Sequence, residues 1–239
     1  MGDEKKLEDF AQHFASKSNK KNLKKMRKRQ LTFEIVIKSS FLLKRVMDFV
    51  FALFFLIIFS PIFIITALAI YIEDPGNIFY TQTRVGKNGR EFQFYKFRSM
   101  VMNADKMKDK LLNKNESGDG VIFKMKKDPR VTKVGRFIRR FSIDELPQLI
   151  NVLKGDMSLV GPRPPLPREV AEYSIADHKR LDVIPGITCI WQVSGRSDIP
   201  FEEQVELDKK YIREYNGIWS DLILLLKTVG AVLSGRGAY

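Results

Sequence analysis

The hydrophobic pattern along the chain is dominated by one long uncharged run. Residues 49–72 (FVFALFFLIIFSPIFIITALAIYI) contain no Asp, Glu, Lys or Arg. At about 1.5 Å per helical residue, this run reaches across a hydrocarbon core of about 30 Å. A cleaved signal peptide does not fit, because a highly charged stretch precedes the run and no small-residue cleavage site follows it. The pattern therefore predicts a membrane segment.

The middle of this run contains Ser60-Pro61. Proline removes a helical hydrogen bond and clashes with the preceding turn, so a sharp bend is expected there. Basic residues, which prefer the cytoplasmic side, flank the run at both ends: Lys38, Lys44 and Arg45 before it, and Arg84, Lys87 and Arg90 after it. We therefore favour a re-entrant membrane helix over 41–75 rather than a plain spanning anchor, with the Ser60 hydroxyl bonding a freed carbonyl.

A short alternating region follows the apolar run. Residues 78–85 and 91–99 are rich in strand-forming residues, and they flank GKNGR, in which Asn88-Gly89 is a favourable tight-turn pair. These residues predict a β-hairpin. On its second strand, one face carries Phe92, Phe94, Lys96 and Arg98. A solvated basic face and a functional one both remain open at this point.

Two later segments have helical periodicity. Residues 131–141 place Val134, Phe137, Ile138 and Phe141 at helical spacing among basic residues, which predicts an amphipathic helix. It could cap a soluble core, but beside a membrane segment we expect it to lie at the interface. Residues 218–235 are apolar and too short to span, which predicts a packed or interfacial helix.

These patterns predict an α+β fold that is mostly helical, with a small β-hairpin, one re-entrant membrane helix and interfacial amphipathic helices. We expect three parts: a basic N-terminal arm over 1–40, the re-entrant helix over 41–75, and a cytosolic interfacial domain over 76–239, where the candidate chemistry lies.

Charge, cysteine and histidine content limit the classes of partner and of site that fit this chain. The chain has 41 basic and 28 acidic residues, a formal net charge of +13, and residues 1–47 alone carry +8. This excess favours an anionic partner such as a membrane surface, a nucleic acid or a phosphorylated substrate. The single cysteine, Cys189, excludes an internal disulfide and fits a reducing compartment, and two histidines are too few for a His/Cys metal cluster.

The sequence SIDELPQL, residues 142–149, places two carboxylates side by side. Ser142 and Glu145 fit a capping box, which is the simplest structural interpretation. With Asp144 as N-cap instead, Pro147 falls at the third helical position, where no intrahelical donor is needed. In that register the helix dipole would keep Asp144 ionised, so that it could act as a nucleophile or metal ligand.

Basic residues recur around this motif. Arg139 lies five residues upstream, and Arg163 stands between Pro162 and Pro164, which suits a bidentate grip on phosphate. An arginine flanked by prolines is also common in ordinary surface turns. Residues 184–197 (IPGITCIWQVSGRS) combine glycines with Trp191 and Arg196, which is typical of a nucleotide pocket.

The ordered set of motifs is more specific than any one of them. Residues 44–239 resemble the bacterial sugar transferases that move a sugar phosphate from a UDP-sugar to polyprenyl phosphate, the small monotopic phosphoglycosyl transferases. The motifs that carry the resemblance are KRVMDFVFALFFLIIFSP, FYTQTRVGKNGREFQFYKFRSM, DELPQLINVLKGDMSLVGPRP, PGITCIWQVSGRS and ELDKKYI. They follow the family order over about four-fifths of the chain.

The resemblance implies a two-step reaction. Asp144 is similar in position to a nucleophile that attacks the sugar-linked phosphate and releases UMP, and Glu145 to the ligand of a required Mg²⁺. Undecaprenyl phosphate then accepts the phosphosugar, which starts a lipid-linked glycan for envelope or exopolysaccharide synthesis. Phosphate binding is implied for Arg139 and Arg163, with electrostatic support from Lys96 and Arg98.

Other positions match the family as well. Ser60 and Pro61 match its membrane-helix break, and Gly186, Trp191 and Arg196 lie in its nucleotide and sugar loop. Two later acids, Asp208 and Asp221, match family positions without an assigned chemical step. Ile184 and Cys189 depart from the usual residues of the loop, and they leave the choice of sugar open.

The implied partners are a UDP-sugar donor, undecaprenyl phosphate and membrane lipid, at the cytoplasmic face of a bacterial membrane, and no nucleic acid. A homodimer and contacts with partner glycosyltransferases remain open. A competing hypothesis is a membrane-tethered basic module that binds nucleic acid or an acidic polymer, motivated by the basic arm; it lacks a recognised nucleic-acid motif. A scaffold with a dead site is a third, and the intact Asp144-Glu145 pair argues against it.

Overall fold

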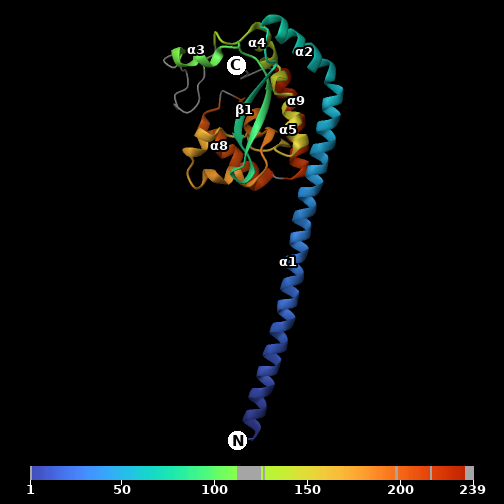
Figure 1. The fold of residues 1–239 in the computed structure, drawn as a ribbon. Helices are drawn as coiled ribbons and strands as arrows, with labels where there is room; N and C mark the ends of the chain where they lie inside the picture. Colours follow the sequence, from blue (N-terminus) through green and yellow to red (C-terminus); the bar gives the residue numbers. More distant parts are fainter. Residues whose placement is uncertain (1, 112–124, 126, 197–198, 216, 235–239) are drawn as a thin grey trace. The chain divides into compact units, whose positions relative to one another are not determined.

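The computed structural model describes residues 2–111, 125, 127–196, 199–215 and 217–234, and the chain divides into two compact units, residues 1–45 and 46–239. The first helix, α1 (Gly2–Ile58), contains all the described residues of the first unit and continues into the second (Figure 1). The predicted divisions after residues 40 and 75 concern placement at a membrane, and they stay predictions.

The apolar run is broken where the sequence predicted. Helix α1 ends at Ile58, α2 (Ser60–Glu73) begins two residues later, and the two helices are bent by 59°. The Ser60 hydroxyl donates to the carbonyl of Ile57 at 2.7 Å, so the predicted bond to a freed carbonyl is confirmed. Pro61 lies in the first turn of α2, where proline is best tolerated, and its missing N–H is the reason that the Ile57 carbonyl is free for Ser60.

Among the described residues, no single helix has the length and apolar character needed to cross a membrane. By those two criteria alone, Lys38–Ile58 and Ser60–Glu73 qualify only as a bent pair.

The predicted hairpin is also confirmed. Strand β1 (Phe79–Val85) pairs antiparallel with β2 (Glu91–Phe97). The connecting turn places Asn88 at φ 56° and Gly89 at φ 76°, a left-handed conformation that these two residue types tolerate best.

A second, parallel pair of strands was not predicted. It joins β3 (Ser158–Val160) to β4 (Gly186–Thr188). A Cβ atom on Gly186 would lie 2.0 Å from the backbone nitrogen of Gly161, so only glycine allows the strands to approach this closely.

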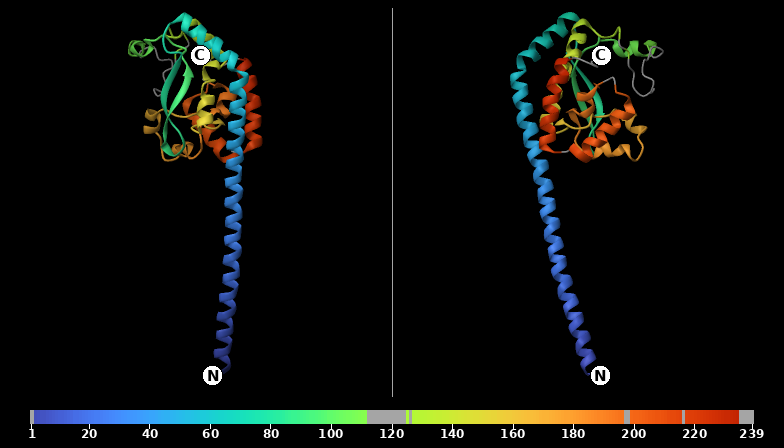
Figure 2. Two further views of the ribbon diagram at one scale, coloured as in Figure 1. Left: turned by 45° about the vertical axis from the view of Figure 1, so that its right-hand side comes forward. Right: turned by 180° about the vertical axis from the view of Figure 1, so that it is seen from behind.

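Helices make up most of the remaining described structure (Figure 2), which confirms a mostly helical fold with a small hairpin. They are α3 (Ala104–Leu111), α4 (Lys133–Arg140), α5 (Gln148–Lys154), α6 (Pro167–Ala171), α7 (Ile190–Ser194), α8 (Phe201–Lys210) and α9 (Ile218–Ser234). Shorter helical turns cover Lys87–Gly89, Ile143–Glu145, Asp177–Asp182 and Tyr211–Tyr215.

The core joins the end of α1 to the hairpin and the later helices. In α1, Ala52 is fully buried against this core, whereas Leu53 and Phe54 are exposed. The buried carboxylate of Asp48 accepts a hydrogen bond from the Leu159 amide at 3.0 Å, which ties α1 to β3. Figures 1 and 2 show this part of α1 running beside α9. The core members are Ala52, Phe92, Phe94, Leu149, Val152, Met157, Leu159, Val160, Tyr211 and Leu224.

A smaller cluster anchors α4 between α2 and the hairpin. Ile138 of α4 packs with Ile70 and Phe97, and Val134 lies against the same cluster. Phe137 is 58% exposed, so the four apolar residues of this helix do not share one environment. In α9, Leu224 is buried while Trp219 is 79% exposed. Both helices are confirmed, and their placement at a lipid interface stays a prediction.

Two helical glycines provide a matched test of this packing. A Cβ atom on Gly135 of α4 would lie 2.0 Å from the Ser99 carbonyl oxygen, whereas one on Gly230 of α9 would meet nothing within 4 Å. We expect Gly135→Ala to lower the free energy of unfolding by about 1–3 kcal/mol through overpacking. Gly230→Ala should leave it unchanged or raise it by up to about 1 kcal/mol, because alanine favours helix. Thermal unfolding followed by circular dichroism measures both, and equal effects would contradict the packing described for α4.

Candidate active site

The two adjacent carboxylates lie on a short 3₁₀ turn, Ile143–Glu145, between α4 and α5. Ser142 precedes the turn in a left-handed conformation, φ 53°, and its side chain makes no capping bond. Helix α5 begins only at Gln148, with Pro147 as its N-cap. The capping box and the Asp144 cap predicted from the sequence are therefore both wrong. The left-handed Ser142 and the proline, which has no N–H to offer, together set the carboxylates one turn ahead of the helix.

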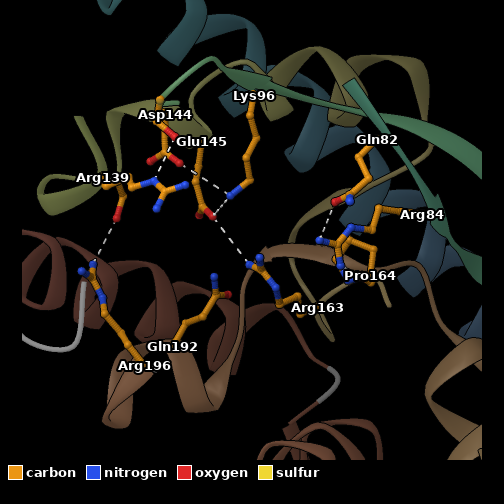
Figure 3. Close-up of polar contacts among 12 residues, drawn as sticks. Gln82, Arg84, Lys96, Arg139, Asp144, Glu145, Arg163, Pro164, Gln192 and Arg196 are labelled. Carbon is orange, nitrogen blue, oxygen red and sulfur yellow. Dashed lines mark hydrogen bonds and ion pairs between the residues drawn. The ribbon is translucent and has the colours of Figure 1, made fainter. Parts of the chain in front are cut away.

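Cationic side chains from three elements converge on this turn (Figure 3). Lys96 of β2 donates to Glu145 Oε1 at 2.7 Å, and its Nζ lies 3.6 Å from Asp144 Oδ2. Arg163, which follows β3, places Nη1 3.6 Å from Glu145 Oε1.

Arg139 of α4 completes this set. Its Nε donates to the Ser99 hydroxyl at 2.9 Å, and its charge acts on Asp144. Three basic residues selected from the sequence are thus brought to one carboxylate pair, although their roles stay predictions.

This environment shifts the pKa values of the two carboxylates in opposite directions. Burial raises the pKa of Asp144 above its ordinary value; Lys96 opposes the rise, Glu145 adds to it, and Arg139 and Arg163 oppose it. Burial would also raise the pKa of Glu145, but Lys96 and Arg163 outweigh burial and lower that pKa to about 2. The sequence had predicted that a helix dipole would favour ionised Asp144. That prediction was wrong, because the residue precedes the helix and is buried.

The described part of the predicted nucleotide loop, residues 184–196, lies beside this cluster. The Arg163 guanidinium lies 5.9 Å from the ring centroid of Trp191, in α7. Arg196, at φ 55°, donates from Nη2 to the Ser142 hydroxyl at 3.3 Å. Figure 3 shows the Gln192 side chain between those of Arg163 and Arg196. Gln192 was not selected from the sequence, although its place in the WQVSGR stretch could have signalled it.

Arg98 and Gly186 have other contacts. The Arg98 guanidinium bonds the backbone carbonyl of Asp74 and lies 3.7 Å from its carboxylate, at the end of α2. Gly186 is buried in β4. Within the described ranges, no hydrogen bond or ion pair joins either residue to the carboxylate pair, so their binding roles stay predictions.

Two arginines that sequence reasoning did not place in the site support Arg163. Arg84 donates to the Pro164 carbonyl at 2.9 Å, and Arg180 to the Arg163 carbonyl at 3.4 Å. Arg84 had been noted only as a flanking basic residue, and no sequence signal marked Arg180. Each supporting contact joins residues that are apart in the chain, so a local sequence pattern does not reveal it.

Two acids that match family positions have structural contacts. Asp208 is fully buried and pairs with Arg180 at 2.6 Å; burial raises its pKa to about 6. Asp221 accepts a hydrogen bond from the Tyr211 hydroxyl at 2.7 Å. Neither side chain therefore needs a chemical step to explain its presence.

The donor set around the carboxylates fits Mg²⁺ only in part. In the portion of the chain that the structure describes, no group of three or more His, Cys, Asp or Glu side chains could hold a metal. Mg²⁺ is commonly held by one or two carboxylates together with substrate phosphates and water. Asp144 and Glu145 can supply that smaller share, with phosphates completing the shell.

Comparisons with known proteins show which family the sequence matches. A model of the family described as bacterial sugar transferase matches residues 39–235. The galactosyl transferase CpsE of Streptococcus agalactiae is 53% identical over 70% of this chain and 37% of its own length. The undecaprenyl-phosphate galactose phosphotransferase of Salmonella typhimurium is 45% identical over 84% of this chain and 43% of its own.

The chain covers most of the length of a third relative. The exopolysaccharide production protein ExoY of Sinorhizobium fredii is 38% identical over 82% of this chain and 88% of its own length. The chain therefore spans less than half of the first two proteins and most of the third.

The opposite pKa directions give a stability test that needs no substrate. Replacing Asp144 by Asn removes a charge that burial disfavours, so Asp144→Asn should unfold at the same or a higher temperature than the wild type at pH 7. Glu145→Gln should lower the free energy of unfolding by about 1–3 kcal/mol, because it removes the negative charge that pairs with Lys96 and Arg163.

The effect of pH on Glu145→Gln follows from the same shift. The pKa of Glu145 falls from 4.5 to about 2 on folding, so its stabilising contribution is complete above the unfolded value and is lost toward pH 2. The difference in unfolding free energy between the wild type and Glu145→Gln should therefore be smaller at acidic pH. Thermal unfolding at a series of pH values measures this, and a variant more stable than the wild type at pH 7 would contradict the assignment.

Proposed function

The chain belongs to the bacterial sugar transferase family, and we propose that it transfers a sugar 1-phosphate from a UDP-sugar to undecaprenyl phosphate, releasing UMP. One observation carries the proposal: the buried carboxylate of Asp144 lies beside a second carboxylate, within a set of three cations from separate elements. A relative named as an undecaprenyl-phosphate galactose phosphotransferase supports the substrate class.

In the first step, Asp144 attacks the phosphorus atom that carries the sugar. A carboxylate oxygen forms a bond to this phosphorus, and the bond from phosphorus to the oxygen of the UMP phosphate breaks. UMP leaves with that oxygen and its electron pair, and the phosphosugar remains on the aspartate. Because burial raises the pKa of Asp144, its ionised form is a stronger base than an exposed aspartate.

The surrounding cations make this attack feasible. A carboxylate and a diphosphate repel each other, and Lys96, Arg139 and Arg163 offset that repulsion where charge accumulates. Contacts with the protein hold these cations near the carboxylates, so little reorganisation is needed during the reaction.

In the second step, a phosphate oxygen of undecaprenyl phosphate attacks the same phosphorus atom. The bond to Asp144 breaks, the free carboxylate is restored, and the sugar is linked to the lipid through a diphosphate. The same cations hold the acceptor phosphate, because both substrates present phosphate to one site. The product would start a lipid-linked glycan, and a relative named for exopolysaccharide production supports this use.

We also propose a Mg²⁺ requirement. Glu145, ionised at neutral pH, would hold the ion together with donor phosphate oxygens, and the ion would supply additional positive charge against the diphosphate. Trp191, Gln192 and Arg196 would contact the nucleotide or sugar. Arg98 and Gly186 would act indirectly. Arg98 would shape the end of β2, and Gly186 would shape the loop that contains Trp191.

Membrane placement follows from the acceptor. Its tail lies in lipid while its phosphate meets a nucleotide sugar at the surface, so a catalyst held in one leaflet serves both. We propose a monotopic protein at the cytoplasmic face, with a re-entrant helix bent at Ser60-Pro61. The competing idea of a basic module for nucleic acid or acidic polymers is not favoured by family membership.

The central test is release of UMP. Purified protein with undecaprenyl phosphate and Mg²⁺ should release UMP from at least one of UDP-galactose, UDP-glucose and UDP-N-acetylgalactosamine. Asp144→Asn should abolish release, because an amide cannot form the intermediate, while the matched variant Asp182→Asn, at an exposed position, should remain active. Mass spectrometry under conditions that preserve acyl phosphates should find the adduct on Asp144. Turnover by Asp144→Asn, or an adduct on another residue, would refute the mechanism.

Topology can be tested by cysteine labelling in cells. Native Cys189 is fully buried, so it should contribute little background. We expect Arg27→Cys and Glu172→Cys to be equally inaccessible to a membrane-impermeant maleimide in intact cells. Both should react after the membrane is opened. Reaction of only one of them in intact cells would place the two sites on opposite sides and exclude the re-entrant arrangement.

A further inference from the structure

The backbone of residues 162–165, the segment that carries Arg163, is held through its carbonyl groups. Three of its four residues are prolines, so only Arg163 has a backbone N–H to donate. All four consecutive carbonyls accept a hydrogen bond: Pro162 from the Gly186 amide at 2.9 Å, Arg163 from Arg180 at 3.4 Å, Pro164 from Arg84 at 2.9 Å, and Pro165 from the Val85 amide at 2.9 Å. A stiff segment fixed at every carbonyl leaves Arg163 little backbone freedom.

The two arginines in this set differ in their counter-ions. The Arg180 guanidinium is paired with Asp208 at 2.6 Å. No carboxylate lies within ion-pair distance of Arg84 in the described part of the chain. Its Nη2 donates instead to the Gln82 side chain at 2.9 Å, and its guanidinium lies 5.3 Å from the ring centroid of Phe94. Arg84 is therefore a largely buried cation held by neutral partners.

A largely buried cation without a hydrogen-bonded carboxylate costs stability, so its retention needs an explanation. Burial, aided by the charge of Arg163, lowers the pKa of Arg84 to about 10, while the carboxylates of Glu169 and Glu145 oppose the lowering. The carbonyl that Arg84 bonds belongs to the residue after Arg163, whose guanidinium lies toward Glu145 and the face of Trp191.

We propose that Arg84 is a positioning residue that orients Arg163 for phosphate binding, by bonding the carbonyl of Pro164, the next residue in the chain. Figure 3 shows Arg84 between Gln82 and Pro164, with Arg163 alongside. Two of the five N–H donors of Arg84 bond protein oxygens, and its Nε is buried without a hydrogen-bond partner, so the double-mutant cycle below separates positioning from direct phosphate contact. The proposal rests on the proposed function for its activity readout only.

A double-mutant cycle tests whether Arg84 acts through Arg163. With the UDP-sugar that the wild type uses fastest, Arg84→Met should lower kcat/KM about 10- to 100-fold, because a misplaced group near the reacting atoms costs about this much. The double variant with Arg163→Met should be no slower than Arg163→Met alone. The control Arg90→Met removes an exposed arginine of the hairpin turn and should retain activity. Multiplied losses in the double variant would overturn the proposal and indicate a direct role for Arg84.

A second readout needs no substrate. The chain has two tryptophans, so Trp219→Phe leaves Trp191 as the only reporter beside Arg163. In this background, Arg84→Met should shift the Trp191 emission to longer wavelength, as Arg163→Met should, because loss of the guanidinium from the ring face admits water. Combining both substitutions should add no further shift. Unchanged emission in Arg84→Met would overturn the proposal.

The two readouts separate the possible failures. An emission shift without UMP release from any UDP-sugar would support the positioning role and count against the proposed function. Should Arg84→Met fail to fold by circular dichroism, Gln82→Ala removes only one anchor of Arg84 and leaves its charge. This variant should shift the Trp191 emission in the same direction by a smaller amount. No shift in a folded Gln82→Ala protein would then overturn the proposal.

Discussion

Two neighbouring carboxylates in a buried site repel each other, and they remain useful only if cations are held against them. In this protein that requirement organises the site. Lys96 bridges Asp144 and Glu145, with Arg163 near Glu145 and the charge of Arg139 acting on Asp144. The result is one carboxylate that is easily ionised and one whose ionisation is opposed by burial. This asymmetry suits the two distinct chemical roles proposed for the pair.

The rest of the fold supplies those cations from fixed backbones. Lys96 comes from a hairpin that packs on α5, and Arg139 from a helix that packs between α2 and β2. Arg163 comes from a proline-rich segment whose every carbonyl accepts a hydrogen bond. Buried polar contacts support these elements from behind. Asn151 of α5 donates to the Gln93 carbonyl and accepts from the Tyr95 amide, which holds β2 in register beside the carboxylate turn.

The apolar helices connect this chemistry to lipid in the proposed function. One face of α1 is packed into the core through Ala52, and the buried Asp48 fixes it to β3. The opposite face leaves large apolar side chains such as Phe54 and Ile57 exposed. Helix α2 continues from the bend and meets α4, which carries Arg139. A single cluster of Ile70, Phe97 and Ile138 therefore links the apolar segment to the elements of the site.

The sequence by itself determined the features that depend on local stereochemistry. Proline breaks the apolar helix at Ser60-Pro61, and Asn88-Gly89 tolerates the left-handed turn of the hairpin, whatever the surroundings. The ordered motifs also identified the family. Only the tertiary structure decided how the carboxylates are presented and which way the pKa of Asp144 shifts. It also decided that Arg98 contacts Asp74 and that Arg84 supports Arg163. These outcomes depend on burial and on contacts between residues distant in the chain, and local pattern contains neither.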